Sequence, residues 1–434
     1  MDDLLCARYQ MTISLAFHII FACVGMIMPF FMAVSHWKWF KTGDQVYLEL
    51  TKAWSKGVAI LFATGAVSGT MLSFELGLLW PKFMVHAGPI FGMPFSLEGT
   101  AFFLEAIALG IYLYGWGRIN RMLHWFFGLL VGIAGTVSGI FVVAANAWMN
   151  SPAGFDWVNG QAINVDPVAA MFNDAWGTQA LHMILAAVMA TSFGVAGVHA
   201  YFLRKNPENP LHAKALGIVI WFAVASALLQ PLSGDLSAKD IAKRQPAKLA
   251  AAEALYETRT HAPLLIGGIV NEQDRTVDYA LEIPGALSFL AHGDAAAEVI
   301  GLDQIPEDEQ PPVAITHYAF QVMVGIGMLM LMIVLYFLVR RIFFRNNVYS
   351  PLLLRMLTIA TPLGFVAVEA GWVVTEVGRQ PWILYGILRT EDSLTPMPGL
   401  IYPLILTTVV YLVLAVVVAW LMMRQFKAVT RKVA

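Results

Sequence analysis

The residues best suited to chemistry in this sequence are a few ionisable side chains inside long apolar stretches. They are His18, Glu98, Glu105, His182, His199, Glu369 and Glu376. An ionisable group at membrane depth costs several kcal/mol, so each one marks a functional site by default. Such carboxylates and imidazoles could hold protons, ions or a metal. A single one can also serve only to hydrogen-bond across helices, and this structural role suits His199, close to Arg204 and Lys205, best.

The spacing of the carboxylates places them in pairs on helix faces. Glu98 and Glu105 are seven residues apart, which is two turns, so they share a face with their backbones ~10 Å apart. A second stripe, with steps of three, four and three residues, consists of Glu369, Trp372, Glu376 and Arg379. Two carboxylate pairs on stripes that face a helical bundle could hold protons, ions or metals.

Haem is a cofactor that needs few protein ligands. A buried haem takes one His, or a His and Met pair, as axial ligands in an apolar slot between helices. His182 and Met323 each lie about one to two turns inside the outer end of an apolar stretch, and at this matching depth they could ligate one low-spin haem. The sequence has no Walker, GxGxxG, HExxH or CxxC motif, so nucleotide, zinc-protease and thiol chemistry lack support. Composition alone leaves haem binding and proton transport both open.

Membrane-spanning helices must position these side chains. Of the 434 residues 58% are hydrophobic and only 13% are charged, whereas soluble domains are about 25% charged. Nine apolar stretches can each cross a hydrocarbon core of ~30 Å, which predicts an all-α integral membrane protein. The stretches are 10–35, 55–79, 96–117, 122–149, 177–203, 214–233, 312–339, 356–378 and 398–423. A net charge of −2 offers no basic field for nucleic acid.

The basic residues in the short connections predict the orientation of the chain. Most of the 27 Lys and Arg lie in alternate loops and near the C-terminus. This set consists of Lys38, Lys41, Lys52, Lys56, Arg118, Arg121, Arg204, Lys205, Lys214, Arg340, Arg341, Arg345, Arg355, Arg424, Lys427, Arg431 and Lys432. Basic loops stay on the cytoplasmic side, so we expect the N-terminus outside and the C-terminus inside.

A long polar segment, 234–311, separates the sixth and seventh stretches and lies outside in this orientation. It divides the chain into 1–233, with six helices, the segment itself, and 312–434, with three helices. A loop of this length is usually functional or disordered. Its first half favours a helix after Pro246, because it is rich in Ala, and we expect its second half to be irregular. No internal repeat is visible, which weighs against an inverted-repeat transporter.

Several short motifs resemble those of a known family. They are RYQ (8–10) leading to His18, FSLEG (95–99), FFLE (102–105), ANAWM (145–149), KLAAAE (248–253), VEAGW (368–372) and GRQPW (378–382). Along essentially its whole length the chain resembles subunit I of the cytochrome bd quinol oxidases. The resemblance implies a quinol:oxygen oxidoreductase of the bacterial inner membrane. Such an enzyme oxidises quinol on the periplasmic side, reduces O2 to water at a di-haem site, and generates a proton motive force without pumping.

The same resemblance implies a role for each buried residue. His182 and Met323 would be the axial ligands of a low-spin haem b. His18 and Glu376 would ligate the two high-spin haems, one a haem b and the other a haem d or a further haem b, in an order left open. Beside the high-spin haems and along a proton path inward would lie Glu98 and Glu105. The haem propionates and edges would be surrounded by Glu369, Trp372, Arg379 and Asn146. The quinol-binding pair would be Lys248 and Glu253.

Two departures from the family pattern, Gln321 and an outer loop that lacks the extra segment some members carry, resemble its cyanide-insensitive branch with a short quinol loop. Gln321 stands where many members have Arg near the low-spin haem, and losing that charge should lower the potential of this haem if nothing compensates. The implied partners are subunit II, often a small single-span subunit, and the lipid bilayer, with quinol and O2 as substrates. The alternatives are a proton- or ion-coupled transporter that uses the same carboxylates, and a haem protein that only relays electrons.

Overall fold

The chain folds into a bundle of long helices. The computed structural model describes residues 2–433, with side chains for 2–426, so the side chains of Lys427, Arg431 and Lys432 from the basic set lie outside the described part. Within the described residues, nine helical segments are long and apolar enough to cross a membrane, which confirms the predicted fold class. They are α1 (Asp3–Thr42), α2 (Gln45–Leu79), α3 (Pro81–Tyr114), α4 (Arg121–Asn150), α6 (Trp176–Lys205), α7 (Pro210–Arg244), α10 (Val313–Phe343), the pair α11 (Pro351–Ile359) and α12 (Leu363–Val377), and α13 (Ile401–Val433).

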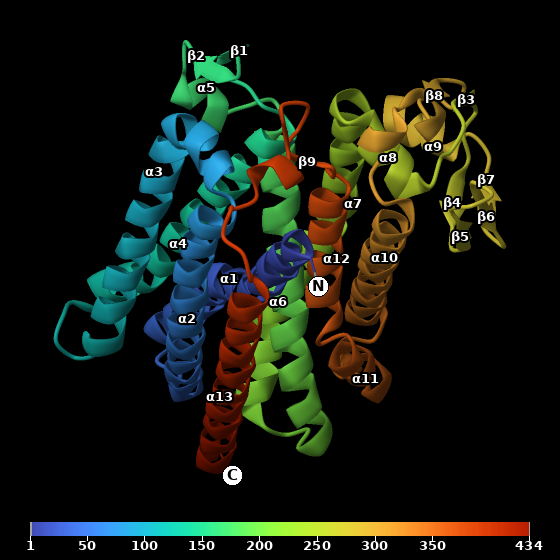
Figure 1. Cartoon of the computed structure of the whole chain (residues 1–434). Coiled ribbons are helices and arrows are strands. Elements are labelled where there is room, and N and C mark those ends of the chain that lie inside the picture. Colours follow the sequence, from blue (N-terminus) through green and yellow to red (C-terminus); the bar gives the residue numbers. More distant parts are fainter. Residues whose placement is uncertain (1, 434) are drawn as a thin grey trace.

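The long helices run side by side, and most short elements lie at one end of the bundle (Figure 1). The C-terminal end of α13 lies at the other end, as the predicted orientation requires. Helix α1 packs against α2, α4, α6 and α13. Its buried Phe31 and Met32 join Phe193 of α6 and Leu216 of α7 in the main apolar core. This central helix therefore connects the two halves of the bundle.

Helix α7 extends well beyond its predicted apolar stretch, which ended at 233. It continues to Arg244, and two ion pairs at four-residue spacing, Lys239 with Asp235 and Arg244 with Asp240, lie on its added turns. Such pairs stabilise a helix in water by roughly 0.2–0.5 kcal/mol each. The helix therefore continues into the polar segment predicted to begin at 234, and a count of apolar residues does not detect such a polar continuation.

The eighth span is not one continuous helix, as the prediction for 356–378 assumed. It breaks into α11 and α12 at Thr361 and Pro362, because Pro has no N–H to donate to the helical ladder. The break packs tightly against α6: a Cβ atom at Gly197 would lie 2.0 Å from the Oγ1 atom of Thr361. A Cβ atom at Gly194 would lie 2.9 Å from the ring of Phe365. Small residues at such contacts let helix backbones approach closely within a membrane.

The outer segment folds into a small structured unit. The predicted helix after Pro246 is α8 (Pro246–Glu253), but the expectation of an irregular second half was wrong. That half holds α9 (Ala286–His292), η1 (Leu302–Gln304), η2 (Glu307–Glu309) and six short strands. The strands pair antiparallel as β3 (Arg259–Thr260) with β8 (Glu298–Val299), β4 (Leu264–Ile266) with β7 (Leu281–Ile283), and β5 (Ile269–Asn271) with β6 (Thr276–Asp278). Buried side chains, among them Leu249, Leu255, Leu287 and Leu302, give the unit its own core. Strands of two or three residues are too short to show a clear alternation in sequence.

Further short elements join the long helices. They are β1 (Asp156–Val158) paired with β2 (Gln161–Ile163), α5 (Pro167–Met171), η3 (Arg345–Asn347), β9 (Trp382–Leu384) paired with β10 (Leu388–Arg389), and η4 (Glu391–Ser393). Asp166 caps α5 by accepting hydrogen bonds from the N–H groups of Val168 and Ala169. Helix α5 packs against α3 and α4. These elements hold the ends of the helices that carry the buried polar residues.

Candidate functional site

A chain of polar side chains connects the end of α12 with the outer segment. Glu376 accepts hydrogen bonds from the Nδ2 atom of Asn146 on α4 and, at 2.5 Å, from the Nη2 atom of Arg379. One turn along α4, the Nδ2 atom of Asn150 donates to the Oδ1 atom of Asn146 at 3.0 Å. The Nζ atom of Lys248 on α8 donates to the Oδ1 atom of Asn150 at 2.5 Å. Three helices far apart in sequence are thus held together by one polar chain.

This cluster contains two basic side chains and one acidic side chain, all on buried or half-buried residues. Arg379 and Lys248 are only 2% and 3% exposed, and Glu376 is the carboxylate that accepts from Arg379. The Nε and Nη1 atoms of Arg379 are buried without a partner among the described residues. Burial lowers the pKa of Lys248 well below its usual value, with a further lowering by Arg379, against the raising effect of Glu376. The unpartnered buried N–H groups of Arg379 suit a bound anionic group such as a haem propionate.

Two more side chains on α12 lack partners. The Oε1 atom of Glu369 and the Nε1 atom of Trp372 are buried, and neither has a hydrogen-bond partner in the described part of the chain. Together with Glu376 they form the stripe that the spacing predicted on this helix. Unsatisfied buried polar atoms are rare in folded proteins and each costs about 1–3 kcal/mol. Glu369 and Trp372 therefore fit a binding site for a ligand whose polar atoms would pair with theirs.

His18 on α1 offers one nitrogen to such a group. Its Nδ1 atom lies 2.9 Å from the Oγ atom of Ser68 on α2, which leaves the Nε2 atom for a metal. Gly69 provides the space for the ring, because a Cβ atom there would lie 2.9 Å from the Cε1 atom of His18. The Nδ1–Cε1 edge of the imidazole thus contacts a serine and a glycine of the neighbouring helix.

His182 and Met323 lie on helices that both pack against α12. The Nδ1 atom of His182 lies 3.0 Å from the Oγ atom of Ser233 on α7, and the Nε2 atom of Gln230 lies 3.3 Å from its Nε2 atom. The sulfur atom of Met323 lies beside Gly371 of α12, where a Cβ atom would be only 3.0 Å away. An imidazole with one committed nitrogen and a thioether fit the donor set of a low-spin haem.

Glu98 and Glu105 both face α4, as their spacing predicted. Glu98 accepts a hydrogen bond from the hydroxyl of Ser138 at 3.0 Å. The carboxyl group of Glu105, which is 6% exposed, lies where a Cβ atom at Gly135 would be 3.1 Å away. The α3–α4 contact therefore holds one buried and one half-buried carboxyl group along the helix that also carries Asn146.

The structure does not bring Lys248 and Glu253 together as a pair. They are five residues apart on α8, which places them ~140° apart around the helix. Glu253 is 1% exposed and neither of its carboxyl oxygens has a partner among the described residues. Burial raises the pKa of Glu253 to about 8. Both side chains are therefore buried instead of lying on a solvated helix face.

Helix α10 holds the outer segment next to α8. The Nδ1 atom of His317 lies 2.8 Å from the carbonyl oxygen of Ala252, to which it can only donate. Gln321, the departure from the family pattern, donates from its Nε2 atom to the carbonyl of Leu265 at 2.8 Å and accepts from the N–H of Gly267 at 3.1 Å. The amide of Gln321 therefore connects the loop to α10.

Asn150, Ser68 and Ser233 are site residues that the sequence prediction missed. Asn150 follows Asn146 by four residues, a helical spacing that could have revealed it. The two serines gave no such signal, because a Ser in a membrane helix commonly bonds to its own backbone.

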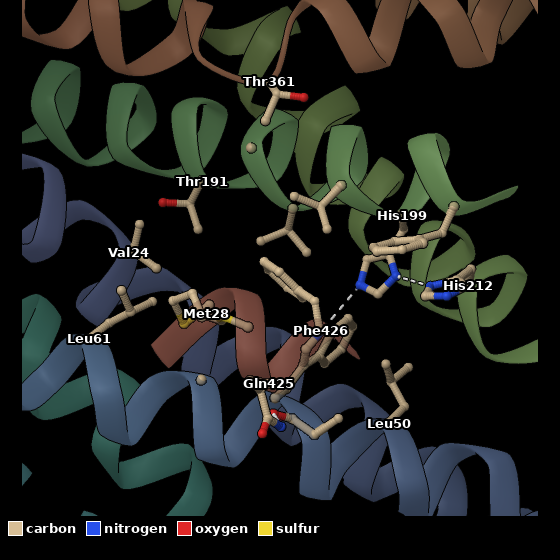
Figure 2. Close-up of a pocket in the computed structure, with 18 of the residues that line it drawn as sticks. Val24, Met28, Leu50, Leu61, Thr191, His199, His212, Thr361, Gln425 and Phe426 are labelled. Atoms are coloured by element: carbon tan, nitrogen blue, oxygen red, sulfur yellow. Dashed lines mark hydrogen bonds between the residues drawn. The ribbon is translucent and has the colours of Figure 1, made fainter. Parts of the chain in front are cut away.

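The His199 side chain belongs to a separate cavity of about 240 Å³, lined almost entirely by apolar side chains (Figure 2). Its Nδ1 atom lies 2.8 Å from the Nδ1 atom of His212, and its Nε2 atom accepts from the Nε1 atom of Trp54 at 3.2 Å. These bonds agree with the structural role expected of His199. The lining includes none of the predicted haem ligands.

Among the described residues the fold is that of a membrane protein with nine candidate spans, and the site collects buried polar atoms that have no partner within this part of the chain. The family model for cytochrome bd terminal oxidase subunit I matches residues 6–430. The chain therefore belongs to the cytochrome bd terminal oxidase subunit I family.

Several relatives cover nearly the whole chain. A Bacillus subtilis (strain 168) protein provisionally assigned as a cytochrome bd menaquinol oxidase subunit I is 37% identical over 98% of this chain and 97% of its own. The cytochrome bd ubiquinol oxidase subunit 1 of the same strain is 29% identical over 98% and 94%. The solved structure of bd oxidase from Geobacillus thermodenitrificans has a TM-score of 0.93 and 40% identity, over 98% of this chain and 99% of that one.

Family membership decides among the functional alternatives. The chain is part of a haem-containing quinol:oxygen oxidoreductase of the bacterial membrane, in which subunit I is normally accompanied by subunit II. This result favours the oxidase over a proton- or ion-coupled transporter and over a simple electron relay. The nine apolar helices agree with a multi-pass protein of the inner membrane.

Proposed function

We propose that this chain oxidises quinol at the periplasmic side and reduces O2 to water at a di-haem site inside the bundle. The observation that carries the proposal is the polar chain from Lys248 through Asn150 and Asn146 to Glu376. It connects the outer segment, the proposed place of quinol oxidation, with a proposed iron ligand. A buried polar chain of this length is expensive in a membrane unless it serves a site.

Three haems are proposed, and they would supply one-electron redox chemistry and a binding position for O2. His182 and Met323 would hold a low-spin haem b, while His18 and Glu376 would hold a high-spin haem b and a haem d or further haem b. Arg379 would bind haem propionates through its unpartnered N–H groups. Glu376 would supply a carboxylate donor, which would suit a high-spin iron that binds O2, because catalytic metal sites keep a position for the substrate.

Charge separation would need no pump in this arrangement. Protons released by quinol stay outside, and protons for water formation enter from the inside past Glu105 and Glu98, which both lie against α4. Each electron then corresponds to about one charge moved across the membrane, worth ~2.3 kcal/mol per 100 mV. A small single-span subunit and lipid would cover apolar faces that subunit II leaves open. Gln321 would give the low-spin haem a lower potential than an Arg there.

A reduced-minus-oxidised absorption spectrum of the purified protein tests the proposed function. Bands of low-spin and high-spin haem together are expected, and pyridine-haemochrome analysis with acid extraction separates haem b from haem d. A colourless preparation that retains both subunits would overturn the proposal.

The rate of quinol oxidation is expected to rise with pH between about 7 and 9. Burial raises the pKa of Glu253 to about 8, so its carboxyl group is largely protonated at pH 7 and can accept a quinol proton only after it ionises. Oxygen consumption with saturating short-chain quinol measures this rise, and Glu253→Gln should slow the reaction and flatten the profile. Glu257→Gln, a change at an exposed carboxylate close by, serves as the control. A Glu253→Gln profile that still rises like the wild type would contradict the assignment.

A further inference from the structure

The two histidines proposed as haem ligands are held by the same arrangement. His18 on α1 lies against Ser68 and Gly69 of α2, and His182 on α6 lies against Ser233 and Gly234 of α7. The His and Ser are 50 residues apart in the first pair and 51 in the second. In both cases the histidine and the Ser-Gly dipeptide lie on consecutive helices that pack against each other. The hairpins α1–α2 and α6–α7 thus present one local device twice, although no repeat is visible in the sequence.

The serine hydroxyls determine which imidazole nitrogen carries the hydrogen. The Ser68 hydroxyl has the carbonyls of Thr64 and Gly65 as acceptors, both at 3.1 Å, and the Ser233 hydroxyl has that of Gln230 at 2.9 Å. A carbonyl can only accept, so each hydroxyl donates to its own helix and its oxygen accepts from the Nδ1–H of the histidine. This arrangement makes two hydrogen bonds, whereas a hydroxyl that donated to the Nδ1 atom would make one.

We propose that Ser68 and Ser233 are positioning residues that hold His18 and His182 in the tautomer with hydrogen on the Nδ1 atom. The Nε2 lone pair of each imidazole is then the one that can bind iron; that of His18 is open within the described part of the chain, whereas that of His182 has the Nε2 atom of Gln230 3.3 Å away, which must move aside for iron. A ligating histidine commonly donates its other N–H to such a partner, which orients the ring and raises its basicity. The inference rests on the proposed function, because it takes both histidines as haem ligands.

The glycines beside the serines differ in how closely they approach the rings. A Cβ atom at Gly69 would lie 2.9 Å from the Cε1 atom of His18, whereas a Cβ atom at Gly234 would lie 3.7 Å from the Cε1 atom of His182. The first distance is below any ordinary van der Waals contact and the second is an ordinary one. Gly69→Ala should therefore displace the His18 ring, while Gly234→Ala should leave His182 in place.

The test measures haem content and the reduction potential of each haem in the purified two-subunit complex, for Ser68→Ala and Ser233→Ala. Loss of an outer partner is expected to weaken retention of the corresponding haem about 10–100-fold and to raise its potential, because the imidazole donates less strongly to the iron. Ser68→Thr and Ser233→Thr keep the hydroxyl and should restore both values. Matched controls are Ser55→Ala on α2 and Ser226→Ala on α7. Both serines are buried and donate to a carbonyl of their own helix, and neither bonds to a histidine within the described part of the chain.

Two outcomes would overturn the inference. The first is that Ser68→Ala and Ser233→Ala retain their haems, and keep the reduction potentials of these haems, as well as the Ser55 and Ser226 controls do. The second is that Gly234→Ala disturbs the haem of His182 as strongly as Gly69→Ala disturbs the haem of His18. His18→Ala and His182→Ala keep this failure distinct from failure of the proposed function. If these two variants lose their haem bands while the serine variants stay unchanged, His18 and His182 are haem ligands but the serines do not position them. If they keep their bands, the ligand assignment itself is wrong.

Discussion

His182→Ala is expected to abolish the low-spin haem band and, with it, oxygen consumption driven by quinol. His182 is the proposed imidazole ligand, and its Nδ1 atom is already committed to Ser233 at 3.0 Å. Without it the iron loses its strongest protein ligand and the electrons of quinol lose their entry point. Loss of a residue that only hydrogen-bonds a ligating histidine, such as Ser233, costs roughly 10–100-fold, and we expect the activity of His182→Ala to fall by more than that. Difference spectra and oxygen uptake of the purified complex measure both effects, and the high-spin bands should remain.

Met323→Leu tests the other ligand of the same haem and has a close control. The thioether of Met323 lies beside Gly371, while Met330, two turns further along α10, is 1% exposed in the apolar core. Met323→Leu should remove or convert the low-spin band, whereas Met330→Leu should leave the spectrum as it is. A normal low-spin band in Met323→Leu would show that the second ligand comes from elsewhere.

Glu376→Gln is expected to remove or shift high-spin bands and to stop O2 reduction, with the low-spin band unchanged. The substitution keeps the size of the side chain but removes the negative charge that accepts from Asn146 and Arg379. A neutral amide is a poor iron ligand, and the buried guanidinium of Arg379 is then left without its anion. CO-difference spectra report the high-spin site separately from electron entry.

Glu75→Gln provides the matched control for this carboxylate. Glu75 is also buried, at 5% exposure, but it accepts from Gln10 at 3.1 Å and lies outside the polar chain of Glu376. Its replacement should leave all haem bands in place. Equal spectral losses in both variants would point to general damage, and an intact high-spin spectrum in Glu376→Gln would remove Glu376 from the ligand set.

Much of the fold follows from composition, because a hydrocarbon layer accepts only helices whose backbone groups are satisfied internally. The nine spans and the stripe from Glu369 to Arg379 could therefore be predicted from apolar runs and helical spacing. The polar turns of α7 up to Arg244 and the strands of the outer segment could not. Their ion pairs and short hairpins are stabilised by contacts that a hydropathy pattern does not contain.

Tertiary structure alone decides which side chains on distant helices contact each other. The motif 248–253 suggested a quinol-binding role for Lys248 and Glu253, but only the tertiary structure showed that Lys248 bonds to Asn150, 98 residues away. His18 likewise finds Ser68 only because α1 and α2 pack together. By itself the sequence determined which groups are buried in the membrane, because burial depends on hydrophobicity and helical period. Which groups share a hydrogen bond depends on helix packing, since a side chain reaches only a few ångströms and its partner's position is set by the whole bundle.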